Sequence, residues 1–169
     1  MKGLFSKMEI SSSCCLGKKE KKDINKHIDQ ELLSKDESYM VYKSKKKVAL
    51  IALGKNTILF CLNKKYFPTI RYLEEKGTEG FIDVFLDEGA VGPLSRGADV
   101  MIPGVMKCKE LLKCKFKKGD VVVINIIGKS IVAVGEAIID FDEMNEKGMG
   151  VCIEVYHRIG DELYEEKYM

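Results

Sequence analysis

Apolar residues recur along the chain with two different spacings, and the spacing predicts which segments are helices and which are strands. Over residues 20–34, Ile24, Ile28 and Leu32 stand at every fourth position between polar residues, which predicts an amphipathic helix. Residues 1–19 show neither the helical nor the alternating spacing. We therefore expect the first 19 residues to be irregular.

Short runs rich in β-branched and apolar residues follow, and they predict three strands. These runs are residues 39–42, 47–53 and 57–62. Residues 54–56, Gly-Lys-Asn, suit a tight hairpin connection between the last two. Pro68 suits the first turn of a helix over residues 70–76, and Gly77 suits its end. Together these elements predict a small N-terminal α+β domain over residues 1–79.

The second half of the chain reads as a series of short strands. Strand candidates are residues 81–87, 98–102, 120–127, 131–139, 150–157 and a last short one at 163–164. Residues 88–97 predict a short helical turn that is interrupted by Gly92 and Pro93. Pro103 is expected to end the strand over residues 98–102. Many short strands with one short helix predict a small barrel. The expected fold class is therefore α+β, with a β-rich domain over residues 80–169.

Charge is distributed unevenly, although the net charge is only +2. Residues 1–65 carry 15 Lys and Arg against 7 Asp and Glu, whereas residues 66–169 carry 13 against 19. This asymmetry suggests a surface that binds polyanions, and the alternative is a solvated lysine-rich surface. No apolar run approaches the roughly 20 residues of a membrane helix, so we expect no membrane contact and a cytoplasmic protein.

The cysteines predict neither a metal site nor a disulfide framework. None of the six lies in a C-x-x-C pair, and neither histidine is close in sequence to a cysteine cluster. We expect free, buried thiols in a reducing compartment and no cofactor. A small enzyme is an alternative, because Asp140, Asp142 and Glu143 cluster and Cys108 lies among lysines. No histidine is nearby in sequence to act as a base, so we expect a protein without catalytic activity.

The most specific motif lies in residues 87–105. Residues 87–91 read Asp-Glu-Gly-Ala-Val, and residues 96–105 read Arg-Gly-Ala-Asp-Val-Met-Ile-Pro-Gly-Val. This pattern resembles the opening of a PUA domain, which is named after pseudouridine synthases and archaeosine transglycosylases. The resemblance covers residues 80–160 and implies a fold that binds RNA. Residues 1–79 are too few for the catalytic domain of a pseudouridine synthase.

The resemblance also implies where RNA would bind. In PUA domains a short helix and the strand after it form one wall of an RNA groove, and Arg96 could offer a forked cation to phosphate there. Gly97 and Gly104 allow positive φ or close backbone approach. The implied groove residues are Arg96, Gly97, Ala98, Asp99, Met101, Lys107 and Lys109. For Met101 the favoured alternative is a place in the core. Residues 107–118 hold six lysines and predict either a phosphate-attracting loop or a solvated one.

Two further segments narrow the resemblance to one family. Residues 67–71, Phe-Pro-Thr-Ile-Arg, and residues 145–150, Asn-Glu-Lys-Gly-Met-Gly, resemble segments of the malignant T-cell-amplified-sequence family. In that family a small α+β domain precedes a terminal PUA domain. Membership implies a non-catalytic RNA-binding translation factor that acts at the small ribosomal subunit in initiation, re-initiation or recycling.

The family resemblance also implies partners. They are ribosomal RNA or tRNA, with the tRNA acceptor end as one candidate, the small ribosomal subunit and a density-regulated-type protein; outside that complex we expect a monomer. A second basic patch that could touch ribosomal RNA is formed by Lys43, Lys45, Lys46 and Lys47. The alternative for these lysines is protection of an exposed strand edge. The alternative function is an accessory subunit that delivers tRNA or rRNA to a separate modification enzyme.

Overall fold

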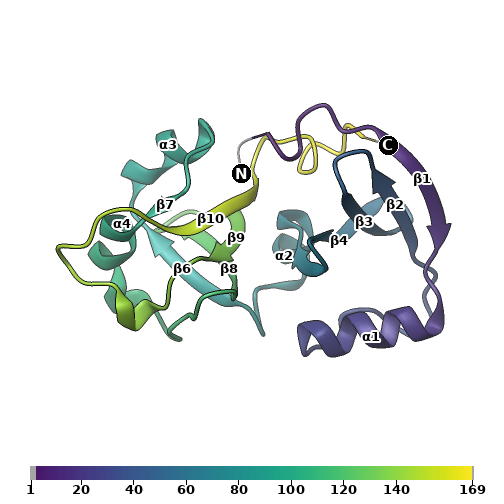
Figure 1. Cartoon of the computed structure of the whole chain (residues 1–169), viewed down its shortest axis with the longest axis horizontal. Coiled ribbons are helices and arrows are strands. Elements are labelled where there is room, and N and C mark those ends of the chain that lie inside the picture. The colour runs from purple at the N-terminus through teal and green to yellow at the C-terminus, as the bar shows by residue number, and fades with distance from the viewer. Residues whose placement is uncertain (1–2, 169) are drawn as a thin grey trace.

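Two five-stranded sheets lie side by side in the computed structural model, which describes residues 3–168 (Figure 1). The N-terminal sheet has the order β1-β2-β3-β4-β5, and all its neighbouring strands are antiparallel. Its strands are β1 (Ile10–Cys15), β2 (Met40–Ser44), β3 (Val48–Leu53), β4 (Asn56–Leu62) and β5 (Lys65–Pro68). Two helices accompany this sheet, α1 (Lys18–Ile28) and α2 (Ile70–Lys76). The α+β class predicted from the sequence is confirmed.

Backbone pairing, rather than side-chain pattern, creates β1. The expectation that residues 1–19 are irregular was wrong for residues 10–15, because β1 pairs antiparallel with β2 and places Ser13 opposite Tyr42, and for residues 18–19, which begin α1; residues 1–2 lie outside the described chain. Most β1 side chains are exposed, so the strand carries no apolar signal in the sequence. The predicted helix over residues 20–34 is present but shorter, since α1 ends before Asp29, which adopts a left-handed φ of 55°.

Helix α2 starts and stops at the residues that the sequence marks. The Thr69 side chain accepts a hydrogen bond from the Tyr72 N–H at 3.2 Å and so caps the helix N-terminus. Gly77 follows the last turn with a φ of 88°, which glycine adopts without strain. Pro68 was expected in the first helical turn, but it is the last residue of β5 and lies opposite Leu59. As a residue of an edge strand, it does not weaken the sheet.

The C-terminal sheet has the order β6-β8-β9-β10-β7, and only its β6–β8 pair is parallel. Its strands are β6 (Ile82–Leu86), β7 (Val100–Met101), β8 (Val121–Ile126), β9 (Ile131–Ala137) and β10 (Val151–Arg158). The predicted β8–β9 hairpin is confirmed, with Gly128 at a φ of 72° in the turn. The strand predicted at residues 163–164 was wrong, because turns occupy that segment.

Two proline-containing segments that were expected to break structure are helical instead. Gly92 and Pro93 lie inside α3 (Val91–Ser95) and do not interrupt it. Pro103 and Gly104 lie inside α4 (Ile102–Lys107), where proline occupies the first turn and loses no hydrogen bond. Gly104 is therefore helical, and the positive φ that we considered for it is wrong.

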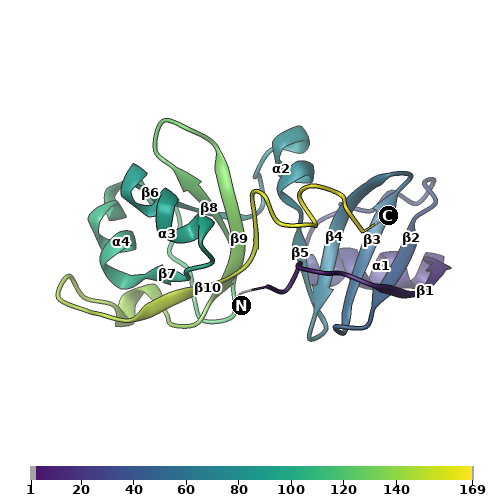
Figure 2. The same cartoon turned by 90° about the horizontal axis from the view of Figure 1, so that it is seen from above.

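A single apolar cluster crosses from one sheet to the other. It joins Phe60 and Phe67 of the N-terminal sheet to Val134 and Tyr156 of the C-terminal sheet, and it includes Phe5. Figures 1 and 2 show that the segment before β1 and the segment after β10 both pass from one sheet to the other. The Tyr168 hydroxyl forms a hydrogen bond with the buried Thr57 hydroxyl of β4. Both ends of the described chain therefore complete the same core.

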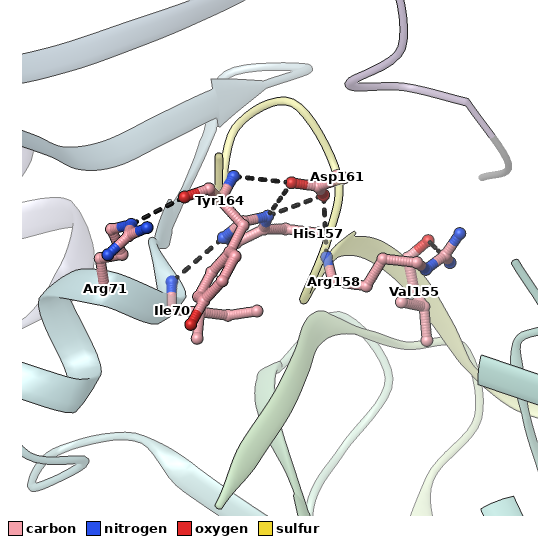
Figure 3. Close-up of polar contacts among 7 residues, drawn as sticks. All are labelled: Ile70, Arg71, Val155, His157, Arg158, Asp161 and Tyr164. Carbon is pink, nitrogen blue, oxygen red and sulfur yellow. Dashed lines mark hydrogen bonds and ion pairs between the residues drawn. The ribbon is translucent and has the colours of Figure 1, made fainter. Parts of the chain in front are cut away.

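A buried histidine lies at the centre of this interface. His157 of β10 is 1% exposed, and its Nε2 accepts a hydrogen bond from the Ile70 N–H at the start of α2, at 3.1 Å (Figure 3). Its Nδ1 lies 2.8 Å from Oδ2 of Asp161, which also accepts from the Arg158 N–H. Close by, Arg71 Nε donates to the Tyr164 carbonyl oxygen at 2.7 Å. These contacts fix α2 against β10.

The six cysteines are free, but Cys152 alone is buried, while Cys61 and Cys108 are half-buried. Burial raises the pKa of the Cys152 thiol to about 12, as expected for an inert core thiol. Cys14, Cys15 and Cys114 are exposed, so for these three the expected burial was wrong. Among residues 3–168, no three His, Cys, Asp or Glu side chains are grouped to hold a metal ion. Within the same residues, every helix is too short or too polar to cross a membrane.

Candidate RNA-binding site

The predicted groove residues follow one another through α3, β7 and α4. Arg96 is exposed at the end of α3, and Gly97 turns the chain towards β7 with a φ of 94°. Asp99 points to β10, where its Oδ1 accepts a hydrogen bond from the Val155 N–H at 2.8 Å. The Asp99 carboxylate therefore helps to hold β7 on the sheet.

Three apolar side chains are exposed at the β7–β10 end of the sheet. Met101 and Val151 are cross-strand partners and are 46% and 36% exposed. Met149 stands two residues before Val151 and is 86% exposed. We name these three residues the methionine patch. The core position favoured for Met101 was wrong, because β7 is a two-residue edge strand that leaves this side chain uncovered.

The loop that carries Met149 is held against α4. The Gly150 carbonyl oxygen accepts a hydrogen bond from the Ile102 N–H at 2.9 Å. Gly148 lies so close to its neighbours that a Cβ there would come within 2.9 Å of the Asn145 carbonyl oxygen and 3.1 Å of Ile102. Because of this packing, Met149 is presented to solvent from an anchored loop. The sequence analysis did not name Met149 or Val151 as candidate site residues. For Met149 the sequence offers a signal, since a methionine between two glycines in a polar loop is expected to be exposed.

Several lysines at or near the predicted groove residues form ion pairs with carboxylates. Lys107 pairs with Asp87, Lys109 pairs with Glu146, and Lys115 pairs with Asp142. The Lys107 ammonium group holds the pKa of Asp87 below its ordinary value, and Lys109 does the same for Glu146. The ion pairs found within residues 3–168 do not include Arg96. Arg96 therefore offers a cation that no carboxylate of the described chain neutralises.

Two of the acidic residues that were considered as catalytic groups of an enzyme contact the lysine-rich segment. Asp140 Oδ1 accepts a hydrogen bond from the Lys118 N–H at 2.7 Å, and Asp142 lies 2.7 Å from the Lys115 Nζ. These contacts link the η3 turn (Phe141–Glu143) to the lysine-rich segment. The lysine-rich segment is partly helical rather than a loop throughout, because it contains the end of α4 and the η2 turn (Lys109–Leu111).

The second predicted basic patch lies on the other sheet. Lys45 pairs with Glu9, and the Lys46 Nζ donates to the Gly3 carbonyl oxygen at 2.9 Å, so both hold the N-terminal segment. Lys43 and Lys47 remain exposed. Since β1 covers β2, Lys43 does not guard a sheet edge, and that alternative was wrong for it. The structure does not bring this patch to the groove, because β2 lies at the opposite end of the molecule from α3 and α4 (Figure 1).

The strand order, the α3–β7–α4 succession and the exposed patch define a PUA-domain protein. A family profile described as "elF2D, PUA domain" matches residues 87–162. A crystal structure of a PUA domain protein from Aeropyrum pernix is similar over 93% of this chain and 91% of that one, with a TM-score of 0.75 and 25% identity. The predicted PUA fold is therefore confirmed.

Two curated relatives are similar over most of the chain, and the second of them carries the name of the family. An uncharacterized protein of Methanocaldococcus jannaschii is 31% identical over 95% of this chain and 99% of its own length. Translation machinery-associated protein 20 of Schizosaccharomyces pombe is 30% identical over 83% of this chain and 78% of its own. The chain belongs to the translation machinery-associated protein 20 family, which is the malignant T-cell-amplified-sequence family that the sequence resembled. The family prediction is confirmed.

Proposed function

We propose that this chain is a non-catalytic RNA-binding translation factor of the cytoplasm that acts at the small ribosomal subunit in initiation, re-initiation or recycling. The name of its fungal relatives links them to the translation machinery. The single observation that carries RNA binding is the methionine patch, which is exposed on a PUA fold whose α3 ends at the unpaired Arg96. Residues 80–169 form the PUA domain and residues 1–79 the partner-binding domain in this proposal.

The groove suits an RNA end with unpaired bases. Exposed, polarisable methionine side chains can lie against the faces of bases, while the Arg96 guanidinium can fork onto a phosphate. Gly97 has no Cβ, so a nucleotide can approach its backbone closely, although its N–H is already donated to the Leu94 carbonyl oxygen at 3.0 Å. The acceptor end of tRNA, which is single-stranded, is the ligand that we favour. The protein partner would be a density-regulated-type protein, with the chain a monomer outside that complex.

A sucrose gradient of cell lysate, run with and without RNase, tests the proposal. The tagged protein is expected in the small-subunit fractions together with a density-regulated-type partner, identified by mass spectrometry. The Arg96→Glu variant is expected to leave these fractions, because the groove loses its unpaired cation. Lys55→Glu, in the β3–β4 turn, makes the same change of charge elsewhere and should sediment like the wild type. Sedimentation in light fractions with a tRNA-modifying enzyme would contradict the proposal.

A further inference from the structure

Lysines gather on one flank of α1. At roughly 100° per residue, Lys18, Lys22 and Lys26 follow each other along one stripe of the helix, and Lys19 lies beside Lys26 in projection. We name these four exposed residues the α1 lysine flank. The acidic residues of the helix, Glu20 and Asp23, project on the other side of its exposed face. Asp23 stands one turn from Lys19 and Lys26, so the flank is predominantly positive with one acid at its border.

A buried lysine fixes the segment opposite this flank. Lys21 is 7% exposed, and its Nζ donates hydrogen bonds to the carbonyl oxygens of Ser34, Lys35 and Glu37 at 3.2, 2.8 and 2.8 Å. Asn25 adds two bonds to the backbone of Leu33, both at 2.8 Å. These bonds hold residues 33–37 to α1, and a shallow cleft runs between the two. The exposed Lys35 is thereby held beside the flank.

The α1 lysine flank is open to an external anion. The ion pairs found within residues 3–168 include none of its four lysines. Two acids adjoin the flank in sequence. Glu20 is already used, because its carboxylate accepts a hydrogen bond from the Gly17 N–H at 2.7 Å, and the ion pairs of the described chain do not join Asp23 to any of the four lysines. A row of lysines with no internal partner attracts a polyanion more strongly than one neutralised by carboxylates.

The buried face of α1 argues against a lipid surface. A basic helix binds a membrane through an exposed apolar face. Here the apolar face is already used, since Ile24 is 4% exposed and packs with Leu33 and Leu59 in the core of the N-terminal sheet. The residues that the flank presents to solvent are all lysines. That combination fits a phosphodiester backbone.

We propose that the α1 lysine flank is a second RNA-contacting surface that binds the phosphate backbone without reading bases. This inference deepens the proposed function and rests on it. Lys18, Lys22 and Lys26 span two helical steps of about 6 Å each, a length that covers roughly three phosphates of one strand. Figures 1 and 2 place α1 and the α3–β7 region at opposite ends of the molecule. A large RNA would thus contact the protein at two separate places, α1 and the α3–β7 region.

Charge reversal on the flank tests this proposal directly. The triple variant Lys18→Glu, Lys22→Glu, Lys26→Glu is compared with the wild type by fluorescence anisotropy, using a 20-nucleotide RNA and a 20-base-pair RNA duplex between 50 and 300 mM KCl. Affinity should fall at least tenfold near 100 mM, and the log–log salt slope should become shallower by about 2, as each lost phosphate contact removes roughly 0.7 to 0.9. Affinity and slope equal to those of the wild type would overturn the proposal.

Charge-matched variants separate a local contact from a general effect of charge. Reversal of Lys55, Lys76 and Lys167 changes the net charge equally on other surfaces and should alter affinity less than threefold. An equal loss in both triple variants would show that only net charge matters and would overturn the proposal. If the glutamate variant melts early, a Lys18→Gln, Lys22→Gln, Lys26→Gln variant is measured instead, with the same criteria.

Photocrosslinking distinguishes this surface from the groove. RNA that carries 4-thiouridine should crosslink to the peptide containing residues 18–29 in the wild type and in the Arg96→Glu variant, as mapped by mass spectrometry. Wild-type crosslinks in residues 18–29 without any in residues 96–109 would overturn the proposed function and leave the α1 surface standing. Crosslinks at the groove without any in residues 18–29 would overturn the α1 proposal alone. Phosphatidylserine vesicles serve as the lipid probe. If the wild type binds these vesicles while the triple variant keeps the RNA affinity of the wild type, the α1 proposal is also overturned.

Discussion

His157 Nε2 accepts a hydrogen bond from the Ile70 N–H at 3.1 Å, although 87 residues separate the two in the chain. The acceptor role of Nε2 requires that this nitrogen carries no proton, so the proton of the neutral ring is on Nδ1 and is donated to Asp161. The Ile70 N–H is one of the donors that a helix N-terminus leaves without a partner in the helix. One imidazole thus completes α2 and joins it to the C-terminal sheet.

Replacement of His157 should destabilise the protein strongly. His157→Ala leaves the Ile70 N–H unpaired. It also opens a cavity beside Phe5 and Phe60, whose ring centroids lie 5.6 and 5.8 Å from the centroid of the imidazole. We expect the free energy of unfolding to fall by about 3 kcal/mol, measured by urea denaturation. His157→Gln keeps a polar group that can accept the same bond and should lose less. Equal losses in both variants would show that the hydrogen bond is unimportant.

The Glu162 carboxylate gives the fold a dependence on acid pH. It accepts hydrogen bonds from the N–H groups of Met8 and Lys7 at 2.8 and 2.7 Å, and these bonds lower its pKa. A lowered folded-state pKa contributes stability above the unfolded pKa of about 4.3, which is lost as pH falls through the folded value. Wild type should therefore melt above Glu162→Gln at pH 7, and the two melting temperatures should converge near pH 3. A difference that does not change with pH would contradict this reading.

Lys21 should be a structural lysine, whereas its neighbour Lys22 is not. Lys21→Met leaves three carbonyl oxygens without their donor, so we expect a loss of about 1–3 kcal/mol in urea denaturation. Lys22→Met removes the same charge from an exposed position and should change stability by about 0.5 kcal/mol at most. Similar losses for the two variants would show that Lys21 does not hold residues 33–37.

Met149 should matter for RNA and not for folding. Its side chain is 86% exposed, so Met149→Ser is expected to change the free energy of unfolding by about 0.5 kcal/mol at most. Affinity for a single-stranded RNA that ends in the unpaired nucleotides of a tRNA acceptor should fall several-fold in anisotropy measurements. Ile127→Ser, at an apolar residue that is 42% exposed elsewhere, is the control and should bind normally. If the RNA affinity of Met149→Ser equals that of the wild type, the methionine patch does not take part in RNA binding.

Strands that bury apolar side chains were predictable, whereas elements held by distant partners were not. The β8–β9 hairpin follows from its β-branched residues, and the end of α2 follows from its terminal glycine. Strand β1 exists because β2 offers backbone partners, which no local pattern reveals. Helix α4 was missed because proline is compatible with both a strand end and a first helical turn.

The site was predictable to a similar degree. The motif located Arg96 and Gly97 at the turn out of α3, which is where the structure has them. The contact of Asp99 with Val155 could not be foreseen, since its partner stands 56 residues later. Exposure of Met101 depends on the shortness of β7, a property of the whole sheet rather than of the surrounding sequence.

The long-range closure of the core has a consequence for synthesis of the chain. Ribosomes produce proteins from the N-terminus, and early segments commonly fold before later ones emerge. Here the cluster around Phe60 also needs Leu163 and Tyr168, which are 2% and 9% exposed. During translation the apolar cluster behind the N-terminal sheet therefore stays incomplete until Leu163 and Tyr168 have been added. A nascent chain stalled before Leu163 would expose this unfinished apolar surface to chaperones.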